Sequence, residues 1–143
     1  QDPMYFVDQY DGMEEVLRDL KNRGIKLGVL SNKPHNITTR LITMMYSSRL
    51  FNVCYGQRFN VERKPSPDGA LEIAKELGVE PKNCLYIGDS DIDMQTGIAA
   101  GMDTVGVLWG FRCRNELEKS RANYIVHEPK EILSIVLGEA AAD

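Results

Sequence analysis

The chain has 143 residues, which is the length of one ordinary domain with a hydrophobic core of its own. Its 43% hydrophobic and 27% charged residues are typical of a globular protein and not of a disordered or membrane-embedded one. The net charge of -4 argues against nucleic acid or an anionic membrane as the main partner, because either would favour a basic face. We therefore expect neither partner.

The cysteines and the first residues bear on where the protein is found. Cys54, Cys84 and Cys113 are widely spaced and form no Cys-x-x-Cys pair, which favours reduced thiols over disulfides or a zinc site. The sequence has no signal-peptide pattern and no apolar run long enough to cross a bilayer. We expect a cytoplasmic protein, with residues 1–3 a cloning remnant and residues 4–143 a single domain.

Helical and strand patterns alternate along the chain. Asp11 and Glu14 suggest a capping box at the start of a first helix, and Gly24 its C-terminal stop. The short apolar run over residues 25–30 predicts a buried strand. The later elements are expected to be a helix at 34–48, a strand at 51–55, a helix at 67–77 capped by Ser66, a strand at 84–87, a helix at 91–100, a strand at 104–108, a short helix at 115–120, a strand at 124–126, a helix at 129–137 and a frayed tail at 140–143.

Strands that alternate with helices through short connections predict a fold of the α/β class. We expect a Rossmann-like three-layer α/β/α arrangement, with a mostly parallel sheet covered on both faces. Ligands of such sheets bind beyond the carboxyl ends of the strands. The segments at residues 31–34, 88–93 and 109–110 are therefore the candidates for a site, together with the loop around Lys64.

Asp89 and Asp93 form a candidate metal site. The first ends a strand and the second lies four residues later, in the first turn of the next helix, so both can face one point. Mg²⁺ prefers hard oxygen ligands and takes only one or two carboxylates from a protein. The alternative is that these acidic residues only favour the helix N-terminus electrostatically.

Ser31, Asn32 and Lys64 are candidates for phosphate binding. A hydroxyl and backbone N–H groups at a helix start can cradle a phosphate, although Ser-Asn before a helix is more often a turn and a cap. A surface lysine is most often only a solvated charge. Beside a phosphoryl group, however, a fixed ammonium would neutralise developing charge.

Taken together, these segments resemble motifs two, three and four of the haloacid dehalogenase-like (HAD) superfamily. The motifs are the serine after one strand, the lysine before a Ser-Pro-capped helix, and Gly-Asp-Ser-x-x-Asp after a third strand. The stretches VLSNKP, KPSPDGALEIAKELGVEPKNCLYIGDSDIDMQTGIAAGM and VGVLWGFRCRNELEKSRANYIV are similar to its phosphoglycolate-phosphatase branch. The resemblance implies Mg²⁺-dependent hydrolysis of a small phosphorylated metabolite through an aspartyl-phosphate.

The resemblance also implies a role for each matching residue. Ser31 and the backbone of Asn32 would hold phosphoryl oxygens, and Lys64 would orient and neutralise the nucleophile and the phosphate. Asp89 would bind Mg²⁺ directly, and Asp93 would support the ion without direct contact or through a water molecule.

The family's first motif, Asp-x-Asp-x-Thr or Val, is not found in the sequence. Its first aspartate is the nucleophile and its second the general acid and base. Asp8 and Asp11 are three residues apart, whereas a strand end directs alternate residues to one side. In the family this motif and usually a cap domain precede the segments found here. We therefore expect a truncated core without a cap, deficient in turnover by itself.

The missing motif has a structural counterpart, because in the family its strand lies mid-sheet between the strands that lead to Ser31 and Asp89. Unpaired strand edges would otherwise be exposed. Three arrangements would remove them: residues 5–8 fill part of the gap, another copy donates a strand in a homo-oligomer, or the flanking strands pair directly.

Three other functions remain open. The chain can be a phosphate- or metal-binding module without catalysis, which binding without hydrolysis would reveal. A receiver-type signalling domain also uses clustered carboxylates, a hydroxyl residue and a lysine, but its acidic pair follows an early strand. A haloacid dehalogenase is less compatible with the acidic residues after Gly88, which favour phosphate chemistry.

Overall fold

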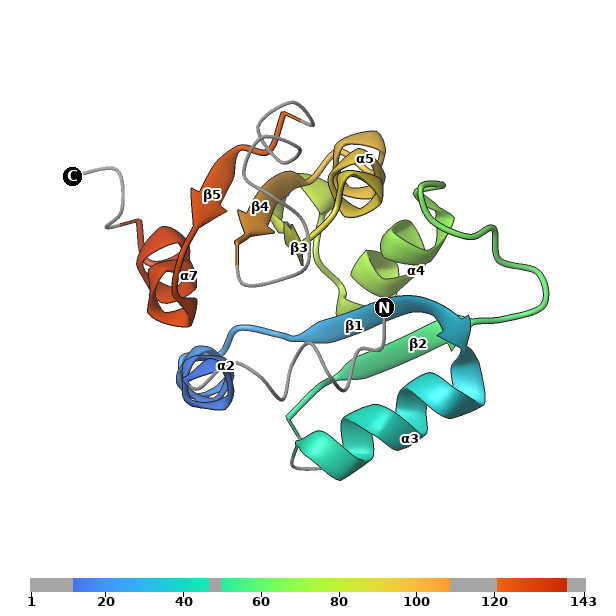
Figure 1. Ribbon diagram of the computed structural model, residues 1–143, viewed down its shortest axis with the longest axis horizontal. Helices are drawn as coiled ribbons and strands as arrows, with labels where there is room; N and C mark the ends of the chain where they lie inside the picture. The colour runs from blue at the N-terminus through green and yellow to red at the C-terminus, as the bar shows by residue number, and fades with distance from the viewer. Residues whose placement is uncertain (1–11, 47–49, 109–120, 139–143) are drawn as a thin grey trace.

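The computed structural model describes residues 12–46, 50–108 and 121–138 (Figure 1). Helices and strands alternate as the sequence predicts. No helix in these parts of the chain is both long and apolar enough to span a bilayer. The elements are α2 (Met13–Asn22), β1 (Gly28–Pro34), α3 (His35–Met45), β2 (Val53–Gln57), α4 (Asp68–Leu77), a 3₁₀ turn (Pro81–Asn83), β3 (Leu85–Gly88), α5 (Asp91–Ala99), β4 (Asp103–Val107), β5 (Tyr124–Val126) and α7 (Pro129–Val136).

The described strands form two sheets. β1 pairs with β2, and β3 pairs with β4, which pairs with β5 in turn. All of these pairings are parallel, with Leu30 opposite Tyr55 in the first sheet and Ile87 opposite Val105 in the second. Parallel strands need crossover connections: α3 supplies the one between β1 and β2, and α5 the one between β3 and β4. The parallel α/β architecture expected from the sequence is confirmed.

The helices cover the strands on two sides, which gives three layers. Neighbouring strand residues face opposite layers: Val29 and Leu85 pack against one hydrophobic cluster, Leu30 and Tyr86 against another. The first cluster is built from α2, the C-terminal part of α3, β4, β5 and α7, and the second from α4 and the segment after α5. Their buried residues are Val16, Leu17, Leu20, Leu27, Ile42, Tyr46, Leu50, Val105, Val107, Val126 and Ile132 in the first, and Ala70, Ala74, Ala100 and Met102 in the second.

The two sheets are not joined through β1 and β3, which are edge strands in the described parts of the chain. A groove of about 870 Å³ is lined by residues 28–31 on one side and residues 84–89 on the other. Figure 1 shows the two sheets as separate groups of strands, while α2 and α7 lie side by side at one end. Direct pairing of these flanking strands, one of the three arrangements considered, is therefore not what the structure adopts. Residues 5–8 lie outside the described residues.

Local signals predicted helix ends with mixed success. The αL conformations of Gly24 (φ 86°) and Gly78 (φ 72°) end α2 and α4 as expected, since glycine tolerates positive φ. The expected N-cap of α2 is wrong, because Gly12 and not Asp11 takes that position, and Glu14 pairs with Arg18. Asp11 itself lies outside the described residues. The expected helix at 115–120, Cys113, and the tail at 140–143 lie outside the described residues.

Close packing of α5 on its strands generates a stability prediction. A Cβ at Gly97 would lie 2.5 Å from Thr104 Cγ2 and 2.8 Å from Tyr86 Cβ, so the helix would have to move outwards. We expect Gly97→Ala to lower the free energy of unfolding by about 1–3 kcal/mol, the usual cost of overpacking. Urea denaturation measures this. Ile98→Ala, on the exposed side of α5, is the control; equal stability of Gly97→Ala and the unmodified chain would contradict this packing.

Candidate active site

The expected site residues come from the carboxyl-end region of the two sheets. Ser31 and Asn32 lie near the C-terminal end of β1, Asp89 directly follows β3, and Asp93 lies in the first turn of α5. Ser31, Asp89 and Asp93 line the same groove as Lys64, which reaches it from the loop between β2 and α4. The strand that carries Ser31 runs to Pro34 and not only to residue 30, because Pro34 pairs with Gln57 of β2 after a register shift beyond Leu30.

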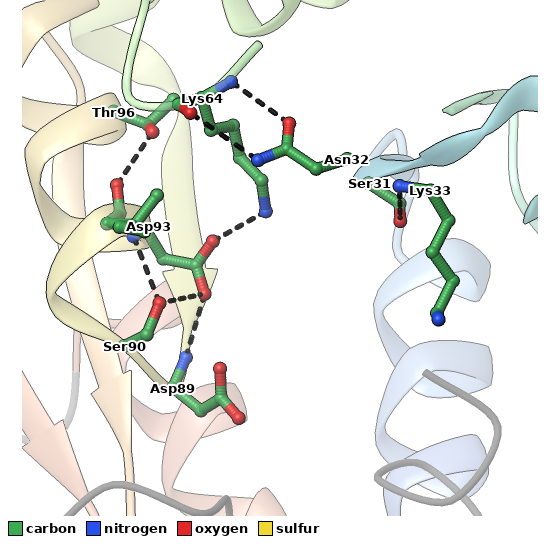
Figure 2. A network of polar contacts seen from close by, with 9 residues as sticks. Ser31, Asn32, Lys33, Lys64, Asp89, Ser90, Asp93 and Thr96 are labelled. Atoms are coloured by element: carbon green, nitrogen blue, oxygen red, sulfur yellow. Dashed lines mark hydrogen bonds and ion pairs between the residues drawn. The ribbon is translucent and has the colours of Figure 1, made fainter. Parts of the chain in front are cut away.

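Lys64 and Asp93 form an ion pair that spans from the β2–α4 loop to α5. Lys64 Nζ donates to Asp93 Oδ1 at 2.7 Å, and the side chains are only 14% and 12% exposed. Asp93 Oδ2 accepts hydrogen bonds from the Asp89 N–H and the Ser90 hydroxyl, both at 3.2 Å (Figure 2). Both oxygens of this largely buried carboxylate thus have partners that compensate its charge, as burial of a charge requires.

Ser90 is a residue of this site that the sequence analysis did not single out. It is the N-cap of α5, where its Oγ accepts from the Asp93 N–H at 3.3 Å while its hydroxyl donates to the Asp93 carboxylate. The signal was present, because serine three residues before an acidic residue is a capping pattern. The sequence analysis also did not identify the need for glycine at position 88, where a Cβ would collide with the Asp93 side chain.

Ser31 and Asn32 contact the site in different ways. Ser31 Oγ accepts a hydrogen bond from the Lys33 N–H at 3.0 Å, and its hydroxyl can still donate. The Asn32 side chain is turned to the backbone of Lys64, with Oδ1 accepting from the Lys64 N–H at 3.0 Å and Nδ2 donating to its carbonyl oxygen at 3.4 Å. The sequence analysis assigned Asn32 a role through its backbone only.

Tyr86 lies beneath the acidic residues, on the face of β3 that α5 covers. Burial raises the pKa of the Tyr86 phenol well above its usual range, and the nearby Asp93 carboxylate raises it further. The phenol therefore stays neutral at physiological pH and adds no negative charge to that of the Asp93 carboxylate.

The carboxylates of this site fit Mg²⁺ better than a metal ion that is enclosed by protein side chains. Within the described residues no three His, Cys, Asp or Glu side chains lie close enough to enclose an ion. Mg²⁺ needs only one or two carboxylates and keeps several waters. Asp89 directly follows β3 and lines the groove, which suits direct contact with an ion. The oxygens of Asp93 accept from Lys64, Ser90 and the Asp89 N–H. Asp93 thus fits an indirect role.

Comparison with known proteins shows extended similarity. Residues 2–107 match the family model of haloacid dehalogenase-like hydrolases. The chain is 29% identical to the phosphoglycolate phosphatase of Aquifex aeolicus, over 95% of this chain and 62% of the relative, and 32% identical to that of Xanthomonas campestris, over 86% and 56%. A crystal structure of a candidate phosphoglycolate phosphatase from Lactobacillus delbrueckii subsp. bulgaricus superposes with a TM-score of 0.86 at 37% identity, covering 91% of this chain and 54% of that one. The chain thus spans little more than half the length of these proteins.

The coupling between Lys64 and Asp93 can be measured with a double-mutant cycle. We expect Lys64→Met and Asp93→Asn each to destabilise the fold, and the double variant to be about 1–3 kcal/mol more stable than their summed effects predict, because residues in direct contact are not additive. Urea denaturation of all four proteins gives this coupling energy. Additive effects would mean that the two charges do not interact in solution.

Proposed function

This chain belongs to the haloacid dehalogenase-like hydrolase family, and we propose on that premise that it is the phosphate-handling part of a Mg²⁺-dependent phosphomonoester hydrolase. The observation that carries the proposal is the convergence of Ser31, Lys64 and Asp89 on one groove at the carboxyl ends of parallel strands. Ligands of α/β sheets bind at such an edge. A hydroxyl donor, an ammonium and a carboxylate there suit a phosphoryl group together with a metal ion.

Each side chain has a distinct part in this function. The Ser31 hydroxyl donates to a phosphoryl oxygen, and Lys64 neutralises charge on the group being transferred. Asp93 holds the ammonium of Lys64 in place through the 2.7 Å ion pair. Asp89 holds Mg²⁺, which when bound supplies positive charge beside the phosphoryl oxygens.

The charges of the groove support the proposed need for a divalent cation. Asp89 and Asp93 place two carboxylates beside the single ammonium of Lys64. The charges of these three side chains sum to a negative value at neutral pH, where carboxylates are ordinarily ionised. A phosphate dianion would be repelled unless a cation at Asp89 offsets that charge. Phosphate and Mg²⁺ should consequently bind with strong mutual dependence.

The nucleophile is the part of the mechanism that these site residues do not supply. No Asp-x-Asp-x-Thr or Val occurs in the printed sequence. The groove between β1 and β3 leads to Ser31 and Asp89, and an extended segment within it would cover the edges of these strands, which no other described strand pairs. The nucleophilic carboxylate reaches the site on such a strand, and strand sharing between copies is one source of it. Without that strand the chain binds phosphate but does not turn over.

The proposal extends to the substrate and the location of the protein. Two of the relatives named above are phosphoglycolate phosphatases, so a small phosphorylated acid of that kind is the proposed substrate. Cys54 and Cys84 are free thiols in the described part of the chain, and burial raises the pKa of both. Thiols kept protonated resist oxidation, which suits a cytoplasmic protein but does not require one.

Binding and turnover test the two parts of this proposal separately. In calorimetric titrations with inorganic phosphate, we expect binding in the presence of Mg²⁺ and at least about tenfold weaker binding without it, as the loss of about 1.4 kcal/mol of coupling predicts. Asp89→Asn and Lys64→Met should weaken binding similarly. Lys130→Met, at an exposed lysine of α7, is the matched control. Unchanged phosphate binding in Asp89→Asn and Lys64→Met would refute the site.

Hydrolysis of a generic aryl phosphate with Mg²⁺ tests the missing nucleophile. We expect no turnover by the 143-residue chain, because the described site holds no carboxylate for covalent attack other than those engaged with the metal and with Lys64. Robust hydrolysis that disappears in Asp89→Asn would show that a nucleophile is present in this chain. Phosphate binding without hydrolysis is also what a non-catalytic module would give, and restoration of turnover by an added strand-bearing fragment separates the two.

A further inference from the structure

The side chain of Asn32 makes a paired contact that phosphate binding does not require. Its Oδ1 accepts from the Lys64 N–H at 3.0 Å, and its Nδ2 donates to the Lys64 carbonyl oxygen at 3.4 Å. Both partners belong to one residue, so the side-chain amide of Asn32 pairs with the backbone N–H and the backbone carbonyl of Lys64 at the same time (Figure 2). Only Asn and Gln side chains offer a donor and an acceptor on one planar group in this way.

The contact matters because Lys64 lies in a connection without regular structure. The loop between β2 and α4 runs from residue 58 to residue 67, and its path is not set by a strand ladder or a helix. The Lys64 side chain leaves this loop and meets Asp93 on α5. Where the backbone of Lys64 sits therefore decides whether its ammonium can reach the groove.

We propose that the side chain of Asn32 is a positioning residue, which holds the backbone of Lys64 at the end of β1 so that the ammonium is aimed at Asp93. The Arg63 guanidinium adds a long contact of 3.5 Å to the carbonyl oxygen of Asn32, which ties the same loop to the same strand. β1 belongs to one sheet, whereas Asp93 follows β3 of the other. Asn32 thus links the two halves of the site through Lys64. The biological meaning of this inference rests on the proposed function, whereas the contacts between Asn32 and Lys64 do not depend on that function.

The accessibility of the Lys64 ammonium gives a direct test. Trace labelling of the whole chain with acetic anhydride, followed by peptide mass spectrometry, reports the reactivity of each lysine separately. Lys64 should react slowly in the unmodified chain, since its side chain is 14% exposed and ion-paired. In Asn32→Leu, which keeps the branched arrangement of heavy atoms but removes both hydrogen bonds, we expect Lys64 to react about tenfold faster, because each lost bond contributes a factor of about 2 to 12.

Three controls separate positioning from general loosening of the fold. Lys26 is an internal reference, because its Nζ donates to the Leu77 carbonyl oxygen at 2.6 Å, away from the Lys64 loop. Asn32→Asp keeps the acceptor and loses the donor, so Lys64 should show intermediate reactivity. Asn36→Ala, at an exposed asparagine of α3, should leave Lys64 unchanged. Asp93→Asn should raise Lys64 reactivity directly, since it removes the charge of the partner.

The outcomes decide the inference without reference to catalysis. A selective rise at Lys64 in Asn32→Leu, with an intermediate value in Asn32→Asp, supports it. An unchanged Lys64 in a folded variant, or an equal rise at Lys26, overturns it. If circular dichroism shows that Asn32→Leu is unfolded, Asn32→Asp alone decides; if both are unfolded, Asn32 serves the fold as a whole and the inference is wrong. Failure of the unmodified chain to bind phosphate with Mg²⁺ would refute the proposed function but leave this labelling result standing.

Discussion

The ion pair between Lys64 and Asp93 is the interaction on which the organisation of the site depends. Two charged side chains that are 14% and 12% exposed are stable only if each is compensated, and the surrounding residues serve that need. Ser90 and the Asp89 N–H occupy the second carboxylate oxygen. Gly88 leaves room for the Asp93 side chain, since any Cβ at that position would overlap it. One requirement thus accounts for several residue choices around the end of β3.

The general fold could be predicted from the sequence because its signals are local. Apolar runs bounded by glycine and short connections specify β3, β4, β5 and their helices to within one or two residues. β1 was predicted too early, over residues 25–30, because the polar residues after Leu30 carry no strand signal. The strand continues to Pro34, which pairs with Gln57 of β2 after a register shift, and this is a contact between distant parts of the chain. The N-cap of α2 was missed for a related reason: Gly12 reaches a φ of 91° that no capping rule identifies.

The site was predictable only as far as topology determines it. Residues after parallel strands lie at one sheet edge, which was enough to place Ser31 and Asp89 near one another. The position of Lys64 depends on the path of an irregular loop, and nothing in the spacing of residues 32, 64 and 93 indicates that they touch. The amide of Asn32 illustrates the limit. Its residue type suggested a turn or a phosphate cradle, but its partner is the backbone of a residue 32 positions away.

The pairing with Asp93 does not prevent Lys64 from binding a phosphate. An ammonium has three N–H donors, and the structure assigns one of them to Asp93 Oδ1. This bond and the held backbone of Lys64 restrain both ends of its four-carbon stem, so the remaining donors stay at the groove that Ser31 and Asp89 also line. A lysine on a free stem would have to lose side-chain entropy, up to about 2 kcal/mol, when it meets an anion. Asp93 and Asn32 impose that cost during folding, so that it no longer opposes binding.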